Sequence, residues 1–143
     1  MKKFKLDPVL NYRKMLENVE CQKLSEVQVE RRKLLDAIDE TRKKLENFYH
    51  NLEKRRNEGI LVQELMMLES NVQHHLEIFE KLTKKLSQME KKVEDQQKVL
   101  KEARRNKQLL ENLKEKFVEK EKGLLQQKEQ SEIDEIAVLF HKR

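Results

Sequence analysis

The sequence predicts an all-α fold: two long helices in an antiparallel coiled-coil hairpin, the second longer and projecting past the first. Three observations predict it. Charged residues make up 41% of the 143 residues, with two Gly, one Pro and no Trp, a composition typical of long helices. Apolar residues recur at the 3–4 spacing of a coiled coil for about nine heptads. A single glycine, Gly59, punctuates the first half of the chain.

The first helix is expected at about residues 8–56. Asp7 suits the N-cap, and Pro8 suits the first helical position, where a missing N–H costs nothing. Apolar residues then follow helical spacing, except that the step from Val19 to Leu24 is five residues. This step predicts a local phase break in the seam.

The turn is expected at about residues 57–59. Basic residues precede Gly59, and glycine can take the left-handed conformation that ends a helix. The second helix is expected at about residues 60–140, with Gly123 as an internal weak point that costs about 1 kcal/mol relative to Ala. Residues 1–143 are predicted to form a single coiled-coil domain.

Matching the two apolar seams gives a register. It is defined by four facing pairs: Leu52 with Leu65, Leu45 with Val72, Ile38 with Phe79, and Leu24 with Val93. The same register places Lys107 near Leu10. It also places Lys114 near Lys3, so the second seam turns polar about where the first helix runs out.

The predicted helices differ in length. About 50 and 80 residues give helices of roughly 75 and 120 Å, so about 25 to 30 residues of the second helix lack a neighbour. This overhang keeps its apolar residues beyond Leu110. Exposed apolar groups of this kind indicate a partner chain.

Several classes of site are not expected. Two isolated glycines cannot form a nucleotide-binding loop, and no Ser/His/Asp set or Cys pair appears, so we expect no catalysis and no cofactor. His74 and His75 point about 100° apart on a helix and cannot share a metal ion. His75, at a seam position, is instead expected to specify register. With one cysteine, no membrane-spanning run and no signal peptide, the protein is expected to be soluble and cytoplasmic.

Three basic clusters, about 11 residues apart, should lie along one side of the first helix. They comprise Arg31, Arg32, Lys33, Arg42, Lys43, Lys44, Lys54, Arg55 and Arg56. We favour a solvated face with ion pairs one turn apart, and the alternative is a stripe that steers the chain toward an acidic protein surface. Nucleic acid is not expected, because acidic residues interrupt the stripe and no aromatic platform accompanies it.

The C-terminal stretch carries a second distinctive pattern. Ile133, Ile136, Ala137 and Phe140 share a helical face. A heterologous partner is the favoured use of this face, and homodimerisation is the alternative. Fraying of the terminus fits less well with so much apolar surface.

At the level of motifs, the sequence resembles the FliJ family of flagellar export proteins. The resemblance rests on four segments: Phe4 to Leu10 followed by Arg13; the turn glycine Gly59; Ala103-Arg104-Arg105 with Lys107, Leu110 and Leu113; and Ile133-Asp134-Glu135-Ile136-Ala137. It implies a noncatalytic two-helix stalk, similar to the rotor stalk of rotary ATPases, in the flagellar type III export apparatus.

The resemblance also implies partners. Family members bind a hexameric FliI-type export ATPase, which the end carrying both termini enters, and they contact an FlhA-type export gate and export chaperones. Carried onto this sequence, the ATPase contact falls on Leu10, Arg13, Leu113, Phe117, Leu124, Ile133, Asp134, Glu135, Ile136 and Phe140. The gate contact falls on Ile38, Phe48, Tyr49, His75 and Phe79. The protein is expected to lie at the cytoplasmic face of the inner membrane through this apparatus, and to be a monomeric hairpin with no nucleic-acid or small-molecule ligand when free.

Three alternatives stay open. The chain could be a self-associating structural or tethering rod, an export chaperone, or the equivalent stalk of a virulence type III secretion system. The predicted difference in helix length favours a stalk over a self-contained rod.

Overall fold

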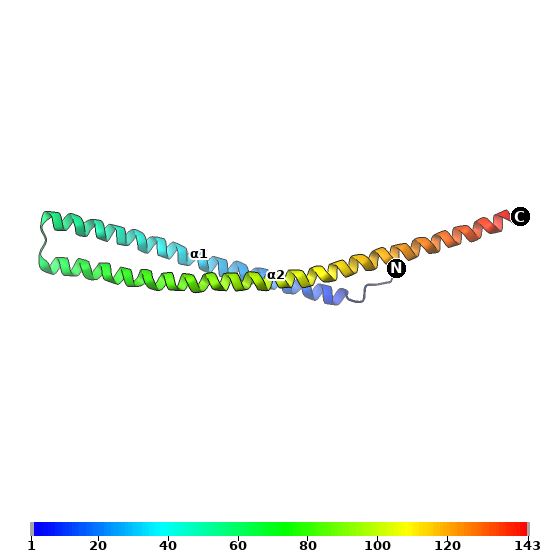
Figure 1. The fold of residues 1–143 in the computed structure, drawn as a ribbon, viewed down its shortest axis with the longest axis horizontal. Coiled ribbons are helices and arrows are strands. Elements are labelled where there is room, and N and C mark those ends of the chain that lie inside the picture. Colours follow the sequence, from blue (N-terminus) through cyan, green and yellow to red (C-terminus); the bar gives the residue numbers. More distant parts are fainter. Residues whose placement is uncertain (1, 143) are drawn as a thin grey trace. The chain divides into compact units, whose positions relative to one another are not determined.

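The computed structural model describes residues 2–142, and two long helices account for nearly all of them (Figure 1). Helix α1 spans Asp7–Glu58 and helix α2 spans Val62–His141. The helices pack against each other in antiparallel directions, and the described residues contain no strand. The predicted all-α hairpin is therefore confirmed. Each helix begins and ends within two residues of its predicted bounds.

The start of α1 differs in detail from the expectation. The Leu10 N–H donates to the Leu6 carbonyl at 2.8 Å, and the Asp7 N–H donates to Phe4 at 3.2 Å. Leu6 is therefore the N-cap, and Asp7 is the first helical residue. Pro8 still lies in the first turn, where its N–H would have no helical partner. The Asp7 carboxylate lies near the positive end of the helix dipole, which it offsets.

The turn lies slightly later than expected. Gly59 ends α1 with φ of 90°, a left-handed conformation that glycine adopts without steric cost. The loop then includes Ile60 and Leu61 before α2 begins at Val62.

By its internal contacts, the chain divides into two compact units. The outer unit combines the chain up to Cys21 with the chain from Val99 onward, and the inner unit is Gln22–Lys98. The boundary in α1 lies at the phase break predicted between Val19 and Leu24.

The inner unit contains the turn and a narrow core. Leu45, Leu52 and Val72 are buried. The Thr41 side chain is also buried, and its hydroxyl donates to the Ala37 carbonyl at 2.8 Å. Such a thin seam leaves most side chains in contact with water, as expected when only two helices share a core.

The register of the inner unit corrects the predicted one. Phe48 packs on His75, with ring centroids 4.8 Å apart, and Arg31 pairs with Glu90 at 3.4 Å. The predicted register would have set Phe48 opposite Glu69. The cause is the turn: because the loop is centred later than residues 57–59, each residue of α1 meets a residue further along α2.

The outer unit has its own core, and its contacts also differ from the predicted register. Leu10 and Leu100 are buried. Lys114 Nζ lies 2.9 Å from the Asp7 carboxylate, and Lys107 Nζ lies 2.5 Å from that of Glu17. The expected neighbours, Lys3 and Leu10, are therefore replaced by two carboxylates, so the polar end of the second seam is neutralised within the chain.

Candidate functional site

The most exposed apolar surface of the outer unit is the end of α2, residues 118–141, which we call the α2 tail. Every residue from Leu124 to Lys142 is exposed. Ile133 is 58% exposed and Phe140 is 72% exposed. In Figure 1 this part of α2 continues as a single helix beyond the start of α1. Large apolar side chains left in water along a single helix indicate a surface that another chain covers.

Apolar side chains surround the tip of the α2 tail on nearly every side. Six of the eight residues from Ile133 to Phe140 are apolar. Successive residues of a helix point about 100° apart, so Val138 and Leu139 point away from the predicted face of Ile133, Ile136, Ala137 and Phe140. Viewed down the helix axis, neighbouring apolar side chains of the tip are separated by at most about 100°. The Val138 and Leu139 side chains are both more than half exposed. Asp134 and Glu135 lie between these apolar directions. The apolar surface of the tip is nevertheless much wider than the single stripe of an ordinary surface helix.

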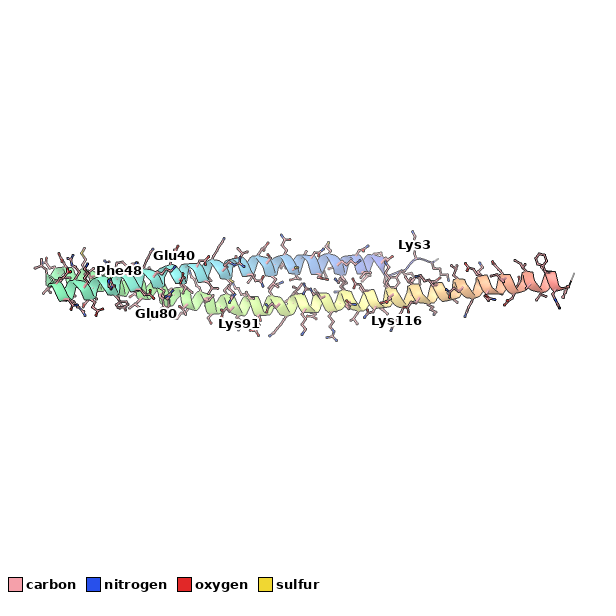
Figure 2. All side chains as sticks on the ribbon, turned by 90° about the horizontal axis from the view of Figure 1, so that it is seen from above. Lys3, Glu40, Phe48, Glu80, Lys91 and Lys116 are labelled. Atoms are coloured by element: carbon pink, nitrogen blue, oxygen red, sulfur yellow. The ribbon has the colours of Figure 1, made fainter. Side chains whose placement is uncertain are left out.

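The base of the tail is held by contacts that the sequence did not suggest. The Phe4 and Phe117 rings lie 5.5 Å apart with 45° between their planes, a tilted arrangement that aromatic pairs favour. Figure 2 shows Lys3 and Lys116, their neighbours in sequence, at the same level of the molecule. The segment before α1 thus covers Phe117. The paired region therefore extends past Leu110, where it was expected to end.

The residues implied as ATPase contacts separate into two groups. Leu10 is only 2% exposed, and Arg13 and Phe117 are partly covered, so these three belong to the paired region. Leu113, Leu124, Ile133, Ile136 and Phe140 are about half exposed or more. Asp134 and Glu135 are also exposed, and Gln130 donates to Asp134 at 3.0 Å across one turn. A partner can reach the second group without opening the hairpin.

A polar cluster interrupts the seam of the outer unit at Glu17. Lys107 lies 2.5 Å and Arg104 lies 3.6 Å from its carboxylate, and the Glu17 side chain is only 16% exposed. The hydrogen bond from Lys107 lowers the pKa of Glu17 against the opposing effect of desolvation. The same bond raises the pKa of Lys107. This cluster was not predictable from the sequence, because Glu17 and Lys107 meet only in the observed register.

The residues implied as gate contacts lie in the inner unit. Ile38, Phe48, His75 and Phe79 are partly covered, while Tyr49 is 48% exposed. His75 Nδ1 lies 2.8 Å from the Asn71 carbonyl oxygen. Because a carbonyl only accepts, Nδ1 carries the proton there. His75 therefore packs on Phe48 as a polar member of the seam, and Tyr49 is the side chain most open to a partner.

Acidic residues of the same chain neutralise much of the basic stripe. Arg42 pairs with Asp39 at 2.9 Å and with Glu46 at 2.7 Å, and Lys43 pairs with Asp39 at 3.2 Å. Arg42 lowers the pKa of Asp39, with Lys43 assisting. The other pairs join α1 to α2: Arg31 with Glu90, Arg55 with Glu64 and Arg56 with Glu69. Because these pairs are exposed, each contributes little to stability.

The described part of the chain contains neither a metal-binding cluster nor a membrane-spanning helix. Within residues 2–142, no group of three His, Cys, Asp or Glu side chains could hold a metal ion. Neither α1 nor α2 is long and apolar enough to cross a membrane. A single helix cannot enclose a cavity, so the depression along Gln127 to Leu139 is an open furrow on the tail.

Comparison with known proteins finds one family. A family model described as the flagellar FliJ protein matches residues 1–143. The match includes the turn glycine and the α2 tail. No curated protein and no solved structure matches the chain.

Proposed function

Because the chain belongs to the flagellar FliJ family, whose members are noncatalytic components of flagellar export, we propose that it is the stalk of the export ATPase. In this proposal the α2 tail binds a hexameric FliI-type ATPase and stimulates its turnover. The remaining hairpin links the ATPase to an FlhA-type gate. The protein itself binds no nucleotide.

One observation supports this proposal above the others: the tail tip is apolar on nearly every side. A groove on a partner covers one face of a helix, whereas a ring with a central opening covers all of them. Val138 and Leu139 would stay in water in a groove that took Ile133 and Phe140. A ring-shaped partner therefore suits the whole surface.

The base of the tail supports the same proposal. A stalk must transmit movement of its tip to the rest of the hairpin. The tail must therefore be packed against the hairpin at its base. Phe4 packs on Phe117 at the point where α2 loses its neighbour. Lys114 and Asp7 add an ion pair one turn earlier. We propose that Leu10 and Arg13 contribute to ATPase binding through this base, and that the exposed residues of the tail make the contact.

The contacts with the gate and the chaperones are proposals of the same kind. We propose that an FlhA-type gate contacts the inner unit around Tyr49, which is exposed and follows Phe48, the residue whose ring packs on His75. Binding to the gate would bring the protein to the cytoplasmic face of the inner membrane. Export chaperones would also bind this stalk. The free protein would be a monomer in dilute solution.

The test of ATPase binding is a turnover assay with purified hexameric ATPase. The double variant Ile133→Asp/Ile136→Asp places two carboxylates on the tail tip and should abolish stimulation, because burying an unpaired charge is costly. The matched control is Gln22→Asp/Ser25→Asp, which adds two carboxylates at the same spacing on exposed positions of α1. Far-ultraviolet circular dichroism should show equal helicity. If the tail variant stimulates as well as the control, the tail is not the contact.

A further inference from the structure

A groove on the inner unit carries basic side chains that have no role in the proposed stalk. It lies between α1 and α2, has a volume of about 410 Å³, and is lined in part by Lys33 of α1 and by Lys85 and Lys92 of α2. Glu30 is the one acidic residue along it. The groove therefore has a positive charge.

These lysines differ from the arginines of the basic stripe. Arg31, Arg42, Arg55 and Arg56 all have acidic partners in the chain. Lys33, Lys85 and Lys92 form no ion pair with any residue from 2 to 142. Three ammonium groups are thus available to an acidic ligand without breaking an existing pair.

The floor of the groove is apolar. Leu34 and Met89 lie there, and each is only partly covered by its neighbours. A groove with an apolar floor and basic side chains along its edges suits an amphipathic helix that carries acidic residues beside its apolar face. Met suits such a floor because its flexible thioether adapts to the shape of the ligand. A small anion would use the lysines and leave the floor uncovered.

The α2 tail is itself a helix of this kind. From Glu129 to Phe140 it carries four acidic residues and no basic residue. Glu129 and Glu132 share a face with Ile133 and Ile136, at spacings of three and four residues. All four side chains are exposed. The tail thus offers acidic groups that complement the lysines and apolar groups that can cover Leu34 and Met89.

We propose that the α2 tail of a second copy lies in this groove as a third helix. Glu129 and Glu132 would meet the lysines, and Ile133 and Ile136 would cover Leu34 and Met89. Lys85 and Lys92 lie about 10 Å apart along α2, whereas Glu129 and Glu132 lie about 4.5 Å apart along the tail. The long, flexible lysine side chains can span this difference. The contact joins different surfaces of the two copies, so it is head-to-tail.

The consequence is a shielded state of the free protein. A tail in the groove cannot at the same time enter the ATPase, so self-association and ATPase binding compete for it. With one short helix and a few exposed charge pairs, the contact is weak. The protein is therefore a monomer at about 10 μM and associates at about 500 μM, where a weak contact becomes populated. Ionic strength weakens the association, since the lysines are exposed.

The test is a mixing experiment with two full-length variants, followed by sedimentation equilibrium. The groove variant Lys85→Glu/Lys92→Glu keeps its tail. The tail variant Ile133→Asp/Ile136→Asp keeps its groove. Each variant alone should remain monomeric at all protein concentrations from about 10 to about 500 μM. Their equimolar mixture should form a one-to-one dimer, because one copy supplies the groove and the other the tail.

A matched control guards against a general charge effect. Lys84→Glu/Lys91→Glu makes the same change at the same spacing, one residue away from the groove, and Figure 2 shows Lys91 on the outer side of α2. This control should associate like the original protein. Adding Glu129→Lys/Glu132→Lys to the groove variant should restore its association.

Three results would overturn the proposal. The original protein could remain monomeric at every concentration. The groove variant could associate normally, which would mean tail-to-tail packing. The control could lose association as fully as the groove variant, which would mean a nonspecific charge effect. The stalk proposal is tested separately from the groove proposal. The groove variant should stimulate the ATPase fully, whether or not it associates with itself.

Discussion

Glu17 and Lys107 lie 2.5 Å apart in the seam of the outer unit, with side chains 16% and 24% exposed. Taking two charges out of water costs free energy, and their attraction offsets that cost only while both are charged. The seam at this level is therefore conditional on charge, unlike the layers built on Leu10 and Leu100. It is the residue-scale feature with the clearest consequences for stability.

The first consequence is a dependence on pH. The folded-state pKa of Glu17 is lowered by its hydrogen bond from Lys107. A group whose pKa falls on folding adds stability above its unfolded pKa, which is about 4.3 for Glu, and loses it as pH drops through the folded value. The outer unit should therefore lose stability below about pH 4.3. Thermal unfolding at a series of pH values, comparing the original protein with Glu17→Gln, measures the difference, which should shrink in acid.

The second consequence is a strong coupling between the two residues. Glu17→Gln alone leaves Lys107 only the more distant Glu111 at 4.0 Å, and Lys107→Met alone leaves Glu17 only Arg104 at 3.6 Å. Because each single variant removes the nearest partner of a partly covered charge, each should cost about 1 to 3 kcal/mol in free energy of unfolding. The double variant Glu17→Met/Lys107→Met should recover most of that loss. Urea unfolding measures all three. Glu94→Gln, in the exposed pair with Lys98, should change stability by less than about 0.5 kcal/mol; equal costs at both pairs would contradict the account.

At the scale of the elements, the two glycines have opposite roles. Gly59 has φ of 90°, a conformation that other residues adopt at a cost. Gly123 is helical, and a Cβ there would meet nothing within 4 Å. One glycine thus ends a helix, and the other weakens one.

Substituting alanine should therefore have effects of opposite sign. Gly59→Ala should lower the free energy of unfolding by about 1 kcal/mol, because the left-handed conformation is strained for L residues. Gly123→Ala should stabilise α2 locally by about 1 kcal/mol. Urea unfolding measures the first change. Slower amide hydrogen exchange around residues 118–128 measures the second, and unchanged exchange would show that Gly123 does not limit the tail.

The helices were predictable because apolar periodicity and two breakers are local signals. Their bounds followed from Pro8 and Gly59. The register was not predictable to the same accuracy, because it depends on where the loop is centred. Ile60 and Leu61 continue the apolar pattern, so nothing in that pattern marks them as loop residues. A change of a few residues there moved Phe48 from the predicted Glu69 to His75.

At the scale of the whole molecule, the sequence predicted the exposed apolar end of α2 but not the full extent of its apolar surface. Ile133, Ile136 and Phe140 stood out because they share a face. Val138 and Leu139 point to other sides of the helix, so the pattern of a single apolar face does not include them. The groove at Lys33 could not be predicted from the sequence, because its two sides belong to α1 and α2. These sides lie next to each other only in the observed register.

In the proposed function, a ring-shaped ATPase encloses the α2 tail. The most direct measurement places a photo-crosslinking residue singly at Ile136, Val138, Leu139 or Phe140, which point in different directions around the helix, with Ser25 on α1 as the control position. Each variant is irradiated in complex with the hexameric export ATPase. The account predicts crosslinks to the ATPase from all four tail positions and none from Ser25. Crosslinks from Ile136 and Phe140 without any from Val138 would mean that only one face is bound, and would contradict enclosure.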